Sequence, residues 1–123
     1  MSTIVTSNVS DGTLSIPTTY VTNGSAKAWV NFNGTGTVAI RDSMNVSSIT
    51  DLDTSVYAVN MTNAFAAANY TNLGWFRSSA DANWLKQGST FTTSSFNFEY
   101  TSASGTNQTE LLIAQTVSFG DLA

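Results

Sequence analysis

The sequence predicts an all-β protein, an antiparallel β-sandwich or a jelly-roll-like barrel with a polar N-terminal arm. Several short segments alternate apolar and polar residues with a period of two, as half-buried strands do. An Asn-Gly pair separates two of these segments, which indicates a hairpin. Ser, Thr and Asn occupy 48 of the 123 positions, and these residues favour turns and extended chain over helix. This length fits one domain, which we place at residues 26–123 behind an arm at 1–25.

The arm contains the only proline, Pro17, and is predicted to be extended or an edge strand. The first hairpin joins residues 26–32 to residues 37–43. Ala26, Ala28, Val30 and Phe32 share the buried face of its first strand, and Val38 and Ile40 point inward from the second, with Arg41 outward. Both central residues of a tight Asn33-Gly34 or Gly34-Thr35 turn would need positive φ.

Further strands are predicted from alternation along the remaining chain. Phe96, Phe98 and Tyr100 share one face of a strand, and the apolar alternation from Leu111 to Phe119 repeats the pattern. The predicted strands cover residues 56–61, 72–77, 96–100 and 111–119. Residues 79–88 are predicted to form a single helical turn, because Ser79 resembles a cap and Gly88 follows the end.

Missing residue types exclude several function classes. The chain has no Cys and no His, so it has no disulfide, no thiolate nucleophile, no Ser-His-Asp triad and no His-ligated zinc site. Its four basic residues are scattered and its net charge is −4, which makes nucleic acid a poor partner. We expect no cofactor.

The N-terminal residues lack the basic and apolar regions of a signal peptide, and no apolar run approaches the length of a membrane span. We therefore expect a chain that is made and folded in a cytosol, with no membrane partner.

Carboxylates are the only candidates for acid–base or metal chemistry. Asp51 and Asp53, followed by Thr54 and Ser55, could offer oxygens to Ca²⁺, but the calcium-loop pattern is absent, so a solvated turn is the favoured interpretation. A glycan-cleaving pair is a third hypothesis for function, because two carboxylates suffice for glycoside hydrolysis. No spacing selects a pair from Asp42, Asp51, Asp53, Glu99 and Glu110.

Four aromatic residues are candidates for contact with a ligand or a subunit: Trp29, Trp75, Phe76 and Trp84. Exposed flat aromatics can stack on sugar rings, whereas core packing or a subunit interface is the commoner use of Trp. For Trp29 the interface is favoured over the core, and the core over a ligand contact. Trp84 is expected to be exposed, because its neighbours in sequence are polar.

One segment resembles a known class of protein. The run Lys27-Ala28-Trp29-Val30-Asn31-Phe32 lies within residues 24–51, which are similar to a segment of small virion-associated and tail-fibre-like proteins of tailed bacteriophages, particularly phages of marine bacteria and cyanobacteria. The similarity extends more loosely to residue 70. There the phage proteins carry Met-Pro-Asp before Ala-Asn-Tyr, and this chain has Phe65-Ala66-Ala67.

The resemblance implies a β-rich, non-enzymatic virion component that is assembled in the host cytoplasm. On this basis we expect a capsid cement or decoration protein that associates with itself, as a trimer, and with the major capsid protein, its arm lying along a neighbouring subunit. The alternative is a tail-fibre tip or receptor-binding module that contacts host surface glycan.

Overall fold

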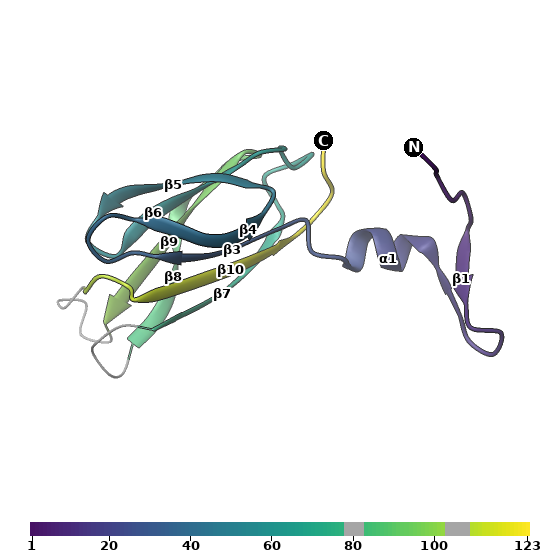
Figure 1. Ribbon diagram of the computed structural model, residues 1–123, viewed down its shortest axis with the longest axis horizontal. Coiled ribbons are helices and arrows are strands. Elements are labelled where there is room, and N and C mark those ends of the chain that lie inside the picture. The colour runs from purple at the N-terminus through teal and green to yellow at the C-terminus, as the bar shows by residue number, and fades with distance from the viewer. Residues whose placement is uncertain (78–82, 103–108) are drawn as a thin grey trace.

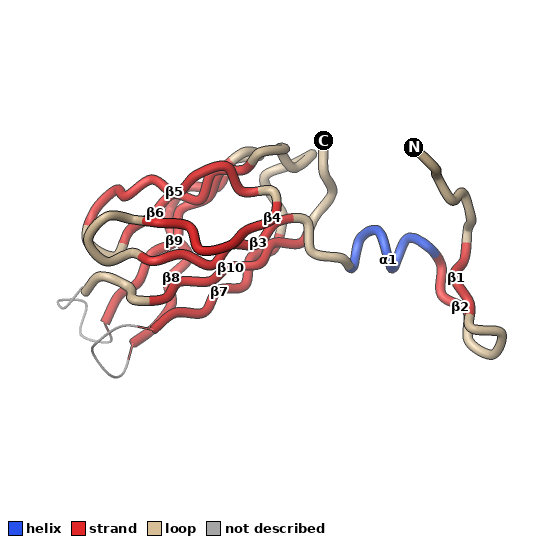
Figure 2. Tube along the Cα trace, in the orientation of Figure 1, coloured by secondary structure: helices blue, strands red, loops and turns tan. Residues whose placement is uncertain are grey.

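The computed structural model describes residues 1–77, 83–102 and 109–123, and consists of a two-sheet sandwich and a projecting arm (Figure 1). In the arm, β1 (Asn8–Ser10) and β2 (Ser15–Pro17) form a small hairpin that leads into α1 (Thr18–Gly24). The strands of the sandwich lie together in two layers, and α1 connects them to the hairpin (Figure 2). The predicted all-β sandwich is confirmed.

Each layer of the sandwich is a four-stranded antiparallel sheet. The first sheet, called sheet B here, has the order β4 (Ala39–Met44), β3 (Ala28–Asn33), β10 (Ile113–Phe119), β7 (Thr71–Arg77). The second, sheet C, has the order β5 (Val46–Asp53), β6 (Val56–Met61), β9 (Ser95–Ser102), β8 (Asn83–Phe91). Consecutive strands lie in different sheets four times, between β4 and β5, β6 and β7, β7 and β8, and β9 and β10, so the chain crosses repeatedly between the two layers.

Aromatic side chains from the two sheets meet in the core. Phe32 of β3 packs edge-to-face on Tyr57 and Phe98 of sheet C, with ring centroids 5.2 and 6.1 Å apart. Phe76 of β7 lies 4.6 Å from Tyr100 of β9. These contacts use the alternation predicted for β3, β6 and β9, whose apolar residues are buried at every second position.

The first hairpin forms as predicted, but its turn differs. Five residues separate Asn33 from Ala39, to which it is paired, and the positive φ falls on Gly36 (63°) and not on Asn33 or Gly34. The tight Asn-Gly turn was therefore a wrong prediction. Asn33 is instead the last residue of β3, where its side-chain amide donates to the carbonyl of Thr35 at 2.7 Å and shapes the longer loop.

The second strand of this hairpin is an edge strand with a bulge. The register shifts between Asn31 and Phe32, which leaves Arg41 between the paired residues Ile40 and Asp42. Arg41 is exposed, as predicted, whereas Ile40 is 37% exposed and not buried, because β4 has a neighbour on only one side. Val38 packs against the core from the turn.

A single residue carries the chain from sheet B to sheet C. Asn45 lies between β4 and β5 and has a φ of 56°, a conformation that Asn tolerates better than most residues. Its side chain accepts a hydrogen bond of 2.7 Å from the backbone N–H of Asn63 and donates one of 3.1 Å to the Asn63 carbonyl. The strand β5 that follows was not predicted, because its exposed edge position gives little alternation.

The turn predicted at Asp51 and Asp53 begins after these residues. Both lie within β5, paired with Tyr57 and Val56 of β6, and both are exposed. The turn itself is made by Thr54 and Ser55, and Ser55 is buried with a φ of 62°.

The helical turn predicted at residues 79–88 is wrong from Asn83 onward. Residues 83–91 form strand β8, which pairs with β9 through Lys86 opposite Glu99 and Gln87 opposite Phe98. A single helical turn gains too few hydrogen bonds to compete with a ladder along a neighbouring strand. Residues 79–82 lie outside the part that the structure describes.

The arm carries more regular structure than predicted, including the unpredicted helix α1. None of residues 1–25 is buried, and the first buried residue of the chain is Ala28 at the start of β3. The ammonium group of Lys27 donates to the carbonyls of Thr22 and Ser25, where a cation favours the C-terminal end of a helix. Figure 1 shows the arm extending away from the sandwich.

Candidate interaction surface

The outward face of sheet B carries a row of apolar side chains that crosses all four strands. Met44 of β4 is paired with Trp29 of β3, Trp29 with Val117 of β10, and Val117 with Leu73 of β7. Directly paired residues on neighbouring strands point to the same side of a sheet, so the four side chains form one continuous row. We call Met44, Trp29, Val117 and Leu73 the apolar row.

The row is most accessible at the β7 edge. Leu73 is 60% exposed, and Trp75, two residues further along the same face, is 73% exposed. Residues 73–75 and 115–117 line a shallow hollow of ≈ 290 Å³ between β7 and β10. Trp29 and Val117 in the middle of the row are partly covered by their neighbours. The surface is therefore an open apolar face and not an enclosed pocket.

The face exists because β10 turns its apolar side outward. Its buried residues are the small Ala114, Thr116 and Ser118, whereas Ile113, Val117 and Phe119 are only partly buried. The large rings from β7, β3 and sheet C already occupy the space between the layers, so only small side chains fit beneath β10. This inverts the usual arrangement of a sheet with one solvated face.

The inner side of β7 and β10 contains one polar pair beside the aromatic core. The hydroxyl of Ser118 donates to the side-chain carbonyl of Asn72 on β7, and the Asn72 amide nitrogen is buried with no partner among the described residues. A buried amide nitrogen without a partner costs free energy. A large exposed apolar patch often marks an interaction site, which makes the outward face of sheet B the candidate surface.

Two of the four aromatic candidates share this face. Trp29 and Trp75 both point outward from sheet B. Phe76 points to the opposite side and packs against Tyr100 and the core, so it contributes nothing to the outer surface. Trp84 lies in β8 opposite Thr101, and its side chain is outside what the structure describes.

Sequence reasoning missed most of the row. Met44, Val117 and Leu73 were not candidates, because alternation alone does not say which face of a strand is buried. The available signal was the sequence of β10. One face of this strand carries large apolar side chains and the other carries small side chains, so either face could have been the buried one.

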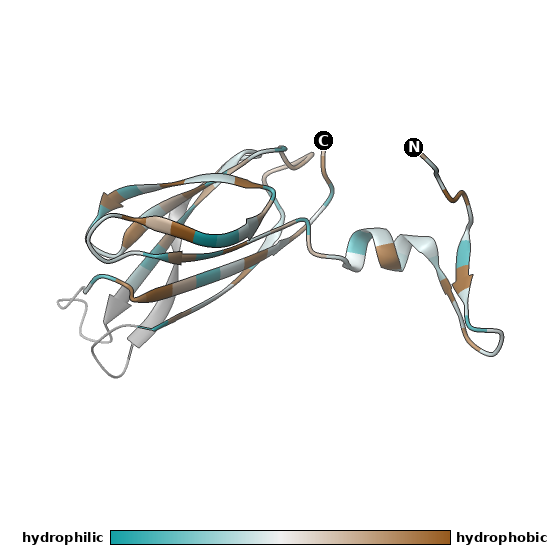
Figure 3. Ribbon diagram, in the orientation of Figure 1, coloured by the Kyte–Doolittle hydropathy of each residue, from teal (hydrophilic) through white to brown (hydrophobic). Residues whose placement is uncertain are grey.

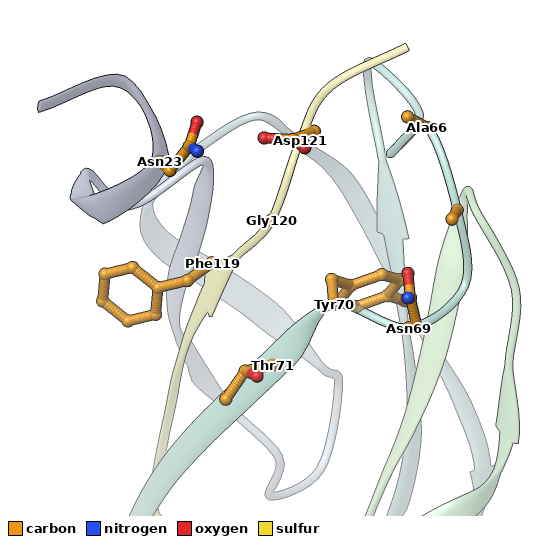
Figure 4. A pocket seen from close by; sticks show the side chains of 9 residues that line it. Asn23, Ala66, Asn69, Tyr70, Thr71, Phe119, Gly120 and Asp121 are labelled. Carbon is orange, nitrogen blue, oxygen red and sulfur yellow. The ribbon is translucent and has the colours of Figure 1, made fainter. Parts of the chain in front are cut away.

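A second hollow lies where the arm meets the sandwich, with a volume of ≈ 320 Å³ (Figure 4). Asn23 at the end of α1 and Asp121 near the C-terminus lie at its rim, and Tyr70 and Gly120 form part of its wall. The Tyr70 hydroxyl is already used, since it donates to the Ser95 carbonyl at 3.1 Å. A methyl group on Gly120 would lie 2.7 Å from the Tyr70 side chain, so glycine is required for this close approach.

One carboxylate among the candidates has a clear structural role. The hydroxyl of Tyr57, a fully buried residue, donates to Glu110 and also to the Gly34 carbonyl at 3.1 Å. Burial raises the pKa of Tyr57 above its usual value, and the hydrogen bond to the Glu110 carboxylate raises it further. Glu110 is thus part of the packing between the first hairpin and the approach to β10. Asp42, Asp51 and Asp53 are exposed on edge strands.

Within residues 1–77, 83–102 and 109–123, no three carboxylates come close enough together to hold a metal ion. In the same part of the chain, no helix has the length and apolar character needed to cross a bilayer.

Comparison with protein-family models, with curated proteins and with solved structures gives no match for this chain.

Proposed function

We propose that this chain is a non-enzymatic structural protein of a tailed-phage virion, which decorates the capsid, binds copies of itself and cements the lattice. The observation that carries the proposal is the apolar row across the outward face of sheet B. Contiguous apolar surface of this kind on a small protein marks an interaction site. The resemblance of residues 24–51 to virion-associated proteins is the reason for placing this interaction in a phage particle.

The chemistry of the described surface supports assembly over catalysis. The apolar row is open and shallow, and the hollow between the arm and the sandwich offers one carboxylate, Asp121. The other titratable group in its lining, the Tyr70 hydroxyl, already donates to the Ser95 carbonyl. A general acid–base pair needs two titratable groups placed around one bond. A cement protein needs only area, because many weak contacts repeated over a lattice add up to high avidity.

Purified particles test this role. Particles assembled without the protein should lose resistance to heat and osmotic shock while still adsorbing to host cells, and wild-type particles should carry the chain at hundreds of copies, as expected for a lattice repeated over a capsid. Particles that stay robust without it would contradict the cement role. Hydrolysis of host polysaccharide by the purified chain, lost when a carboxylate is replaced, would contradict the non-enzymatic role.

One observation favours the second candidate, a tail-fibre tip that contacts host glycan. Trp75 is 73% exposed beside Gln115, and an exposed ring next to an amide is an arrangement that stacks on and hydrogen-bonds to a sugar. In that case particles lacking the protein would remain robust and fail to adsorb, and the chain would be present in a few tens of copies at most.

A further inference from the structure

The N-terminal arm is built from elements that are not stable by themselves. Its hairpin has three residues in each strand, its helix has seven, and no residue of either is buried. Isolated two-stranded hairpins and helices this short are marginal in water. The arm therefore lacks within its own chain the packing that would hold it folded.

The arm also exposes an apolar surface. Val9 and Ile16 are paired across the hairpin and lie on one face of it, and Leu14 (73% exposed) and Tyr20 (71% exposed) extend the apolar surface along the arm. Figure 3 shows hydrophobic residues at intervals along the projecting hairpin and helix. Each chain thus presents two separate apolar surfaces, the arm and the apolar row.

The chain exposes more surface than a compact monomer of its mass, and the excess has the size of one side of an interface. A compact monomer of 13.1 kDa is expected to expose about 6,400 Å². This chain exposes 7550 Å², which is about 1,150 Å² more. A standard interface buries about 800 Å² on each partner, so covering the arm would return the chain to the range of compact proteins.

The charges of the two surfaces are opposite in sign. Asp11 is the only charged side chain of the arm, and backbone N–H groups of Leu14 and Thr13 lower its pKa, which keeps it anionic. The strands of sheet B carry two basic residues, Arg41 and Arg77, and one carboxylate, Asp42, so the sheet has a net positive charge.

We infer that the outward face of sheet B is the docking site for the N-terminal arm of a second copy of this chain, in a head-to-tail contact. The arm leaves the sandwich in a direction that carries its apolar residues away from its own body, where a neighbouring copy can receive them (Figure 1). Because the two surfaces differ, each copy donates one arm and receives another, so the contact closes into a ring or continues as a chain. The inference rests on the self-association in the proposed function and identifies the two surfaces that make this contact.

Complementation between two full-length variants tests the contact. The face variant carries Leu73→Ser and Trp75→Ser, and the arm variant carries Ile16→Ser and Tyr20→Ser. All four positions are exposed, so both variants should keep the circular dichroism of the wild type. The control is Leu52→Ser, which removes a half-exposed leucine from the edge strand β5 of the other sheet.

Sedimentation of the wild type and the control at micromolar concentration should give oligomers. Each docking variant alone should associate at least tenfold more weakly. An equimolar mixture of the two variants should form a heterodimer and stop there, since one copy supplies the intact arm and the other the intact face. An arm variant that assembles like the wild type, a mixture that stays monomeric, or a monomeric wild type would overturn the inference.

A second measurement does not depend on how well the variants fold. Because the chain has no Cys, single labels can be placed by Ser15→Cys on the arm of one population and Gln115→Cys on the face of another. Energy transfer between the two labels should appear on mixing and disappear when unlabelled chain is added in excess. Absence of transfer in an oligomeric sample would overturn the arm contact alone. A chain that passes both tests but does not bind capsids would overturn the virion role alone.

Discussion

The hydroxyl of Tyr57 donates a hydrogen bond of 3.1 Å to the carbonyl oxygen of Gly34, and a methyl group added to Gly34 would lie 2.3 Å from that hydroxyl oxygen. Gly34 also donates its backbone N–H to the carbonyl of Leu111 at 2.8 Å. The glycine is therefore held between a core ring of sheet C and the chain that enters β10. It is required here for its lack of a side chain, whereas Gly36 is required for its positive φ.

Replacement of Gly34 by Ala should lower the free energy of unfolding by about 1–3 kcal/mol, the usual cost of overpacking a core. Val, the larger residue, should cost more. Gly36→Ala should cost about 1 kcal/mol through its backbone conformation alone. Gly24→Ala is the matched control, because a methyl group there meets nothing within 4 Å. Urea unfolding of the four variants would contradict this account if Gly34→Ala were as stable as Gly24→Ala.

Asn45 should be sensitive to both its conformation and its hydrogen bonds, since one residue turns the chain between the two sheets. Asn45→Ala removes the bonds to Asn63 and places an unfavourable residue at positive φ, and should cost about 2 kcal/mol. Asn45→Gly keeps the conformation and should cost less. Equal losses for the two variants in thermal unfolding would show that the backbone conformation contributes nothing.

Arg41 links three segments through one guanidinium group. It donates to the carbonyls of Phe32 at 2.7 Å and Leu112 at 2.6 Å, and so spans from β4 across β3 to the entry of β10. Arg41→Lys keeps the charge but cannot reach both acceptors, so we expect a loss of about 1 kcal/mol. Arg77→Lys, exposed at the end of β7, is the control and should change the melting temperature little. A similar small change for both variants would rule out the bridging role.

Buried tyrosines should make the fold sensitive to alkali. Burial raises the pKa of Tyr70 from 10.0 to about 12, and the pKa of Tyr57 is raised as well. Because the folded state favours the neutral phenols, their contribution to stability is complete below pH 10 and is lost as the pH rises toward 12.

The free energy of unfolding should therefore fall steadily above pH 10 and reach a plateau only beyond the folded-state values. Ultraviolet absorbance of tyrosinate should rise together with the loss of circular dichroism. Tyr70→Phe should flatten part of this dependence. Full ionisation of the tyrosines near pH 10 with the fold intact would contradict the burial argument.

Residue patterns in the sequence were sufficient for the class and most of the strands. Alternation predicted the positions of β3, β6 and β9, and for β3 and β9 also which residues share the buried face, because these strands lie inside their sheets and each buries one full side. Among the edge strands the rule succeeded for β7 and failed for parts of the other three. There β5 and β4 expose residues on both sides, and β8 takes its structure from pairing with β9.

The candidate surface was decided by the tertiary structure. Sequence alone identified Trp29 and Trp75 as aromatic candidates for contact with a ligand or a subunit, but it could not say that Trp29 pairs with Val117, or that Phe76 turns away from Trp75 into the core. Alternation specifies two faces of a strand without saying which one is inside. For β10 the answer depended on how much space the rings of Phe32, Phe76 and Tyr100 left between the sheets, which is a property of the packed fold and of no single segment.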